Sequence, residues 1–299
     1  DLKRTLVLDA SSLKAAGVTR LNVYTNDGIV VESGQTLDMG PGGSVNLTGA
    51  SLDVLGDIHV PGGSVKLKST ATVVVGAADP AALDQHITVG PDSRIATAGL
   101  WTNDALARNT VAPIALDGGS ISIAAGVLRM EAGSLLDASA GGWLKSDGKT
   151  WVGGKGGDIA LTGSLPLLAG EMRSYGMLDS SLKASRGGKL TLSTPEVGIG
   201  GTAPASPDPA ELWLSEGFFQ QGGFSSYAIT GVNGLTVSDG AVVAPRTQTR
   251  VLDSRRLNAA SGASIGDFSQ TTQLLWSVAK AERPVTHLSL AATSDDFGN

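Results

Sequence analysis

The chain has 299 residues, with 22 Lys and Arg against 28 Asp and Glu and no cysteine, which excludes disulfides and thiolate metal sites. It has no basic stripe with interleaved aromatic residues, so we expect no nucleic-acid partner, and no apolar run approaches the roughly 18 residues that a membrane-spanning helix needs. Because 41 residues are glycine and only 17% are charged, Ser, Thr, Asn and Gly must supply much of the surface. We also expect no signal peptide, since the chain opens on charged residues.

A six-residue phrase recurs along the chain. Residues 42–47 (GGSVNL) return 20 positions later at 62–67 (GGSVKL), and looser copies occupy 118–123, 156–161 and 187–192. Short alternating runs bounded by turn-forming residues surround these phrases and indicate short strands. One coil of a parallel β-solenoid takes about 20 residues, and the next coil stacks on it at about 4.8 Å. The pattern therefore predicts an all-β protein folded as a parallel β-helix.

The interval between the first two phrases predicts which residues stack. Val45 should lie next to Val65 and Leu47 next to Leu67, which gives two apolar ladders inside the coil. The residues between them should face solvent, because side chains alternate along a strand. We expect the glycine pairs to occupy corners with positive φ, where a side chain would be strained.

Residues 1–250 form the predicted solenoid, and four stretches without the repeating rhythm look like loop insertions into it. These lie at about 77–86, 100–109, 143–157 and 202–209. The last of them is rich in proline, and the third is rich in glycine and lysine.

The C-terminal part of the sequence has a different pattern. Residues 251–283 predict an insertion outside the coil, with a short helix over 268–282 that Asp267 caps and Pro284 ends. Residues 284–299 look like a return to the β-helix. They stop without a clear closing element, which indicates a chain truncated from a longer one.

Groups able to perform catalysis are sparse. Asp57 and His59 share one face of a predicted strand, but no third group is expected beside them, which favours a solvated surface. Glycoside hydrolysis needs two carboxyl groups about 5–9.5 Å apart. A uniform rung of 20 residues would place Asp53 and Asp57 opposite Val73 and Ala77, so no such pair is expected. We therefore predict that the chain is not an enzyme and holds no metal or other cofactor.

Trp101, Trp143 and Trp151 lie in the predicted insertions rather than in the ladders. Loops that project from a rigid scaffold commonly carry binding residues, and indole rings stack on the faces of sugars. These three residues are the candidate ligand contacts. The alternative is that each tryptophan packs its own loop onto the coil, and the sequence favours this alternative.

The repeated phrases, with the runs GASLDVLGDIHVPGGSVKL and AGSLLDASAGG, resemble the haemagglutinin-type repeats of large bacterial exoproteins. The stretch LWLSEGFFQQGGFSSYAITGVNGLTVSDGAVVAP is similar to a segment in the middle of such proteins. The family is the filamentous haemagglutinin-like substrates of two-partner secretion, and the resemblance covers roughly residues 20–250. The amino-terminal secretion domain of the family is not found in this sequence.

The resemblance implies a right-handed β-helix that is exported through an outer-membrane secretion barrel and acts as an adhesin or biofilm-matrix filament. It implies a location outside a Gram-negative bacterium, secreted, on the cell surface or in the extracellular matrix. The implied partners are extracellular polysaccharide and the surface of a host or neighbouring cell. Two alternatives are a carbohydrate-binding or carbohydrate-active β-helix protein and the stalk of a contact-dependent toxin.

Overall fold

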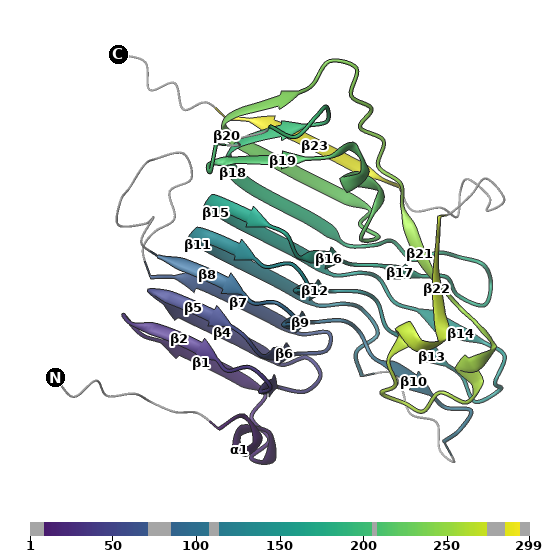
Figure 1. The fold of residues 1–299 in the computed structure, drawn as a ribbon. Helices are drawn as coiled ribbons and strands as arrows, with labels where there is room; N and C mark the ends of the chain where they lie inside the picture. The colour runs from purple at the N-terminus through teal and green to yellow at the C-terminus, as the bar shows by residue number, and fades with distance from the viewer. Residues whose placement is uncertain (1–8, 71–84, 108–113, 205–207, 274–284, 294–299) are drawn as a thin grey trace.

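The computed structural model describes residues 9–70, 85–107, 114–204, 208–273 and 285–293 (Figure 1). This part of the chain is mostly β, as the sequence predicts. Its helical residues are confined to the short elements α1 (Ala10–Ala15), η1 (Glu216–Gln220), η2 (Ser254–Leu257) and η3 (Ile265–Phe268).

The largest sheet is a stack of parallel strands that runs the length of the molecule (Figure 1). Its main path is β1 (Arg20–Tyr24), β4 (Ser44–Gly49), β7 (Ser64–Ser69), β11 (Ser120–Met130), β15 (Asp158–Leu168), β18 (Lys189–Ile199), β20 (Ser226–Val237) and β23 (His287–Ala292). Strands β2 (Gly28–Val31), β5 (Ser51–Val54) and β8 (His86–Val89) form a parallel run that also joins β11, and β19 (Glu211–Leu214) joins β18.

A second parallel sheet lies beside the first and repeats with it. Its strands are β3 (Thr36–Asp38), β6 (Asp57–His59), β9 (Arg94–Ala96), β12 (Leu135–Asp137) and β16 (Glu171–Arg173). Each strand comes after one or two strands of the large sheet and before the next, so the chain winds through both sheets in each rung. The apolar faces of both sheets share one continuous core. The fold is thus an all-β, solenoid-like stack of parallel strands.

The predicted stacking of the first two phrases is confirmed, because Val45 pairs with Val65 and Leu47 with Leu67. The looser phrases continue the same two ladders despite their unequal spacing. The first ladder is Leu21, Val45, Val65, Ile121, Ile159, Leu190, Tyr227 and Leu288. The second is Val23, Leu47, Leu67, Ile123, Leu161, Leu192, Ile229 and Leu290.

The glycine pairs of the phrases are required for two different reasons. Gly42 and Gly62 have φ of +70° and +61°, as predicted for corners. The first glycines of the three looser phrases, Gly118, Gly156 and Gly187, do not have positive φ, and neither does the second glycine of any phrase, which corrects the prediction for these positions. The second glycine of each phrase lies instead against the backbone of the preceding rung. A Cβ on Gly119 would overlap the carbonyl oxygen of Gly63, and a Cβ on Gly157 would overlap that of Gly119.

Two of the predicted insertions contain strands rather than loops alone. Strand β10 (Trp101–Asn103) pairs with β13 (Gly142–Leu144), which forms an antiparallel hairpin with β14 (Trp151–Gly153). Beside them, β17 (Gly176–Met177) pairs with β21 (Gln248–Leu252). These strands and η3 enclose a second, smaller apolar cluster: Trp101, Ala140, Leu144, Met177, Leu252, Ile265 and Phe268.

The predicted helix over 268–282 is wrong in its first part. Residues Ser269–Gln273 form β22, which pairs antiparallel with β21 in place of beginning a helix at Asp267. The available edge of β21 decides the outcome, because a short polar segment gains backbone hydrogen bonds there. The remainder of the predicted helix, 274–282, lies outside the described residues.

The other predicted boundaries have mixed outcomes. Most of the insertion at 77–86 lies outside the described residues, but its last residue, His86, begins β8 and pairs with Ser51. In the insertion at 202–209, none of the described residues belongs to a helix or strand. After Pro284, β23 pairs in parallel with β20. In the described part of the chain, no helix has the length and apolar character needed to cross a membrane.

Candidate binding cleft

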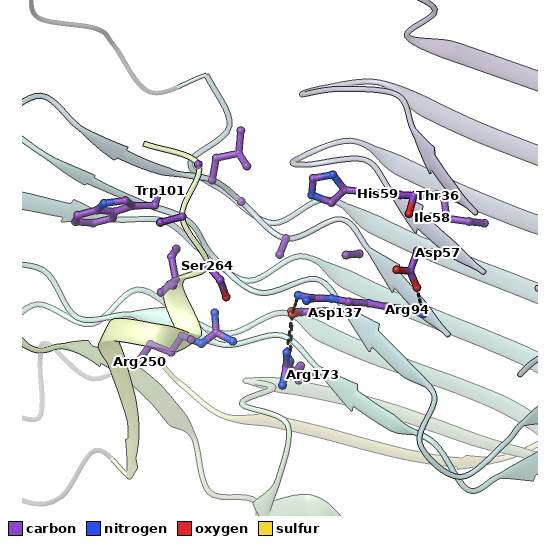
Figure 2. Close-up of a pocket in the computed structure, with 18 residues that line it drawn as sticks. Thr36, Asp57, Ile58, His59, Arg94, Trp101, Asp137, Arg173, Arg250 and Ser264 are labelled. Carbon is purple, nitrogen blue, oxygen red and sulfur yellow. Dashed lines mark hydrogen bonds and ion pairs between the residues drawn. The ribbon is translucent and has the colours of Figure 1, made fainter. Parts of the chain in front are cut away.

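A cleft of about 290 Å³ lies between the outer face of the five-stranded sheet and the segment 262–266 that precedes and enters η3 (Figure 2). Strands β6, β9, β12 and β16 contribute the floor, and β21 contributes Arg250 at one side. Trp101 borders the cleft on the side of the smaller apolar cluster. The cleft is thus built where the C-terminal insertion folds back over the coil.

Strand register places the polar floor of the cleft in one row. Asp38 pairs with His59, His59 with Ala96, Ala96 with Asp137, and Asp137 with Arg173. Because side chains alternate along a strand, residues that pair directly share a face of the sheet. The apolar residue in the middle of each strand points the opposite way, into the core. The polar side chains of these three-residue strands therefore face the cleft.

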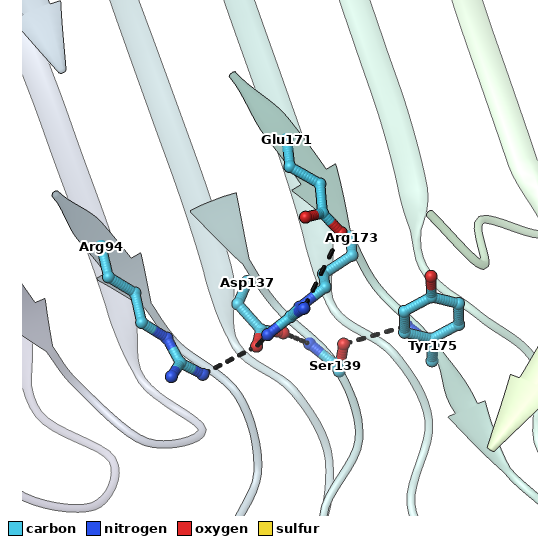
Figure 3. Close-up of polar contacts among 6 residues, drawn as sticks. All are labelled: Arg94, Asp137, Ser139, Glu171, Arg173 and Tyr175. Carbon is cyan, nitrogen blue, oxygen red and sulfur yellow. Dashed lines mark hydrogen bonds and ion pairs between the residues drawn. The ribbon is translucent and has the colours of Figure 1, made fainter. Parts of the chain in front are cut away.

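Asp137 is the centre of an ion-pair network on this floor (Figure 3). Its side chain is 2% exposed, and its Oδ2 accepts hydrogen bonds from Arg94 Nη2 at 2.9 Å and Arg173 Nε at 3.1 Å. Its Oδ1 accepts from the backbone N–H of Ser139 at 3.0 Å. Arg173 also faces a second carboxylate, because its Nη1 lies 3.7 Å from Glu171 Oε1. The carboxylate thus fixes two guanidinium groups that come from neighbouring rungs.

The environment keeps Asp137 ionised. Burial is the largest influence and by itself would raise the pKa of Asp137. The positive charges of Arg173, Arg250 and Arg94 and the hydrogen bond from Ser139 together outweigh burial, so the pKa is lowered from 3.8. A general acid needs a raised pKa, so Asp137 is suited to holding charged neighbours and not to donating a proton.

Arg250 brings a third guanidinium to the cleft. It lies on β21, is 8% exposed, and its guanidinium carbon is 5.2 Å from the centre of the Tyr175 ring. Within the described part of the chain, its guanidinium makes no side-chain hydrogen bond and no ion pair. Burial lowers the pKa of Arg250; Asp137 opposes this shift, and Arg173 adds to it. Arg250 therefore carries a buried positive charge without a direct counter-charge.

The opposite end of the cleft holds His59 and Asp57. His59 Nδ1 lies 3.4 Å from Asp38 Oδ1, and Asp57 Oδ1 accepts a hydrogen bond from the backbone N–H of Arg94 at 2.9 Å. Both partners come from neighbouring rungs, where the sequence predicted no group of this kind. The arrangement is a set of polar contacts between neighbouring rungs.

The uniform 20-residue rung is wrong for Asp53 and Asp57, and Val73 and Ala77 lie outside the described residues. Asp53 pairs with Thr88, because an insertion after β7 lengthens this rung and the strand that stacks on β5 begins only at His86. Asp53 Oδ1 lies 3.4 Å from His86 Nε2. Across the residues that the structure describes, no cluster of three or more His, Asp or Glu could hold a metal ion.

The first tryptophan among the candidate ligand contacts is part of the smaller core. Trp101 is 1% exposed, its Nε1 donates to the carbonyl oxygen of Ala259 at 3.0 Å, and its ring centre lies 5.0 Å from that of Phe268. These contacts attach the C-terminal insertion to β10. They favour the alternative in which Trp101 packs its own segment onto the coil.

The other two tryptophans lie on the β13–β14 hairpin and are partly exposed. Trp143 Nε1 donates to Asp104 Oδ2 at 2.8 Å, and Trp151 Nε1 donates to the carbonyl oxygen of Leu178 at 2.9 Å. Trp151 pairs with Leu144, next to Trp143 in the chain, so the two indoles face opposite sides of the hairpin. The structure does not bring them together into one binding surface.

The residues that build the cleft are different from those the sequence singled out. Arg94 and Asp137 are 43 positions apart, and Asp137 and Arg173 are 36 apart. The signal in the sequence is a charged residue beside an apolar one in each short strand, as in the runs SRIA, LLDAS and EMRS. Insertions of unequal length between the strands conceal this signal.

The fold and the cleft define a class: an all-β, parallel, solenoid-like protein with an arginine-lined cleft beneath an insertion. No protein-family model matches the chain, and no curated protein or solved structure matches it significantly.

Proposed function

We propose that this chain is a structural and adhesive module of a secreted bacterial surface filament, built as a right-handed parallel β-helix. The observation that carries the proposal is the pair of apolar ladders that continue through eight strands while the segments between them vary in length. Stability in such a stack comes from neighbouring rungs, so a filament lengthens by adding rungs and varies its surface by changing insertions.

The resemblance of the repeated phrases to haemagglutinin-type repeats supports the rest of the proposal. The chain is secreted to the cell surface or extracellular matrix of a Gram-negative bacterium through an outer-membrane secretion barrel. Its partners are extracellular polysaccharide or the surface of a host or neighbouring cell. The absence of cysteine suits export in an unfolded state, because disulfides formed in the periplasm would obstruct threading.

We also propose that the chain is not an enzyme. The support is chemical: the most buried carboxylate of the cleft, Asp137, accepts hydrogen bonds from two guanidinium groups and has a lowered pKa. Such a carboxylate is a poor general acid and, with its lone pairs occupied, a poor nucleophile.

Attachment measurements test the adhesive role. Beads coated with the chain should retain bacterial cells or their extracellular polysaccharide well above beads coated with an unrelated β-rich protein. Soluble chain added in excess should reduce this retention, because it competes for the same partner. Retention equal to that of the control beads for every surface tried would overturn the proposal.

A carbohydrate-binding role of the hairpin is the second candidate, because Trp143 and Trp151 remain partly exposed. Replacing each by alanine and measuring binding to a panel of neutral and acidic glycans separates this role from the first. A loss confined to the Trp143→Ala or Trp151→Ala chain supports it, and unchanged binding in both refutes it.

A further inference from the structure

The charges that line the cleft are unbalanced at Arg250. Arg94 and Arg173 both engage Asp137, and Arg173 also faces Glu171. Arg250 borders the same cleft, is about nine-tenths buried at 8% exposure, and has no carboxylate within ion-pair distance among the described residues. A charged group withdrawn from water without a partner destabilises a fold, so such groups are rare unless something else occupies the site.

The charge of Asp137 acts on Arg250 from a distance, but Asp137 forms no hydrogen bond or ion pair with it. Its Oδ2 accepts from both Arg94 and Arg173, and its Oδ1 accepts from the backbone N–H of Ser139. The other carboxylate that lines the cleft, Asp57, lies at the far end beside His59 (Figure 2). Three guanidinium groups therefore share a cleft with two carboxylates, and the excess positive charge lies at the end nearest Arg250.

The backbone around Arg250 is held on both sides. Met177 of β17 pairs with Arg250 in parallel, and Thr271 of β22 pairs with it antiparallel. The ring of Tyr175 lies against its guanidinium group. A side chain fixed in this way loses little freedom on binding, which favours affinity.

We propose that the cleft binds an oxyanion group, a carboxylate, sulfate or phosphate, against the guanidinium of Arg250 with Arg173 beside it. The planar guanidinium fork matches the paired oxygens of these groups. A volume of about 290 Å³ lies just below the roughly 300–1,000 Å³ range of ligand sites, so the cleft takes no more than one sugar-sized unit. The oxyanion site is independent of the proposed adhesive function. The further statement that the oxyanion belongs to an acidic polysaccharide rests on that function.

Calorimetric titration of the whole chain in low salt tests the site. The probes are sodium glucuronate, sulfate and phosphate, with glucose as the uncharged match for glucuronate. We expect saturable binding of at least one oxyanion and none of glucose. Stronger binding of a glucuronate oligosaccharide than of glucuronate identifies a polysaccharide source, and equal or weaker binding identifies a free oxyanion.

Three variants assign the binding to the cleft. Arg250→Met keeps the length of the side chain and removes its charge, and should weaken oxyanion binding at least about tenfold, as expected for loss of a charge-assisted hydrogen bond. Arg129→Met removes an exposed arginine from β11 and should bind as the unchanged chain does. Ser264→Glu places a carboxylate at an exposed position lining the cleft and should also weaken oxyanion binding, because the like charges repel.

Two results would overturn the site: no saturable binding of any oxyanion, or equal affinity in the unchanged, Arg250→Met and Ser264→Glu chains. If Arg250→Met does not fold, Ser264→Glu alone decides, since it changes an exposed residue. Failure of the site leaves attachment of coated beads intact. Failure of the adhesive function leaves the titrations with small oxyanions intact, so the two failures can be told apart.

Discussion

Replacing Gly157 by alanine is the sharpest perturbation of the stacked rungs. The new Cβ would overlap the carbonyl oxygen of Gly119 and would lie 2.7 Å from both the carbonyl carbon and the carbonyl oxygen of Gly118. All three atoms are backbone atoms, which do not move aside as a side chain can. The two rungs would have to separate locally, although the apolar ladders on either side hold them together.

The magnitude follows from what separation weakens. Gly157 N donates to Ala138 O at 2.7 Å, and Asp158 N donates to Gly119 O at 3.1 Å. Weakening both hydrogen bonds and straining the packing should together destabilise the fold by about 2–4 kcal/mol. Reduced backbone freedom in the unfolded chain opposes this by only about 0.4–1 kcal/mol.

Gly234→Ala is the matched control. Gly157 directly precedes β15, and Gly234 lies in β20 of the same sheet; Gly234 has no positive φ, and a Cβ there would meet nothing within 4 Å. The control should be unchanged or more stable by about 0.4–1 kcal/mol. Urea unfolding followed by circular dichroism measures both variants, and hydrogen exchange in β11 and β15 reports the local loss. Equal stability of the Gly157→Ala and Gly234→Ala chains would refute the close-contact reasoning.

Three further predictions follow from the core, the network and the insertion. Ile123→Ala, which truncates a ladder residue that is 1% exposed, should lower the free energy of unfolding by about 2–4 kcal/mol in urea titrations, and a loss below about 1 kcal/mol would contradict a packed ladder. Asp137→Asn should cost about 1.5–3 kcal/mol at pH 7, the range for hydrogen bonds to charged groups, because it leaves Arg94 and Arg173 without their shared carboxylate. Since the folded pKa of Asp137 is lowered from 3.8, the ionised carboxylate stabilises the fold fully above about pH 5, and this stabilisation is lost as pH falls through the lowered pKa. The free energy of unfolding should therefore depend less on pH between about pH 5 and 2 in the variant than in the unchanged chain. The same pH dependence in both chains would contradict this. Trp101→Ala should loosen the C-terminal insertion, because it removes the packing and the hydrogen bond that hold the insertion on β10. Limited proteolysis should then cleave the chain faster between residues 253 and 268. An unchanged cleavage rate would contradict the packing role of Trp101.

The stacking of rungs could be predicted from the sequence because each phrase carries its own register. Apolar residues at alternate positions specify which side chains face inward, and the glycine pair before them marks where the backbones meet. Ile121 therefore pairs with Val65 although they are 56 positions apart, because each directly follows a Gly-Gly-Ser run. Uniform spacing was the part of the prediction that failed, since solenoids accept insertions at corners without disturbing the ladder.

The cleft could not be predicted in the same way. Arg94, Asp137 and Arg173 meet because β9, β12 and β16 stack in adjacent rungs, although insertions after β9 and β12 separate the residues by 43 and 36 positions. Arg250 reaches them from β21, which pairs with β17 across a separation of 73 positions. No local pattern encodes a contact of that length.

The helix predicted over 268–282 failed for a related reason. Its first residues have a polar, alternating pattern that suits a strand as well as a helix, and the free edge of β21 decides between them. Local propensity is weak beside a full ladder of backbone hydrogen bonds, so a partner strand distant in the sequence overrides it.

Disulfide cross-linking across two rungs tests the central claim of the stack most directly, and the chain has no other cysteine to interfere. Lys66 pairs with Ser122, and adjacent strands lie about 4.8 Å apart, within the Cα separation that a disulfide spans. Chains carrying Lys66→Cys with Ser122→Cys should oxidise readily and unfold at a higher temperature than the reduced form. Chains carrying Lys66→Cys with His86→Cys, the partner that a uniform 20-residue rung requires, should not cross-link. The reverse result would contradict the stacking described for these rungs.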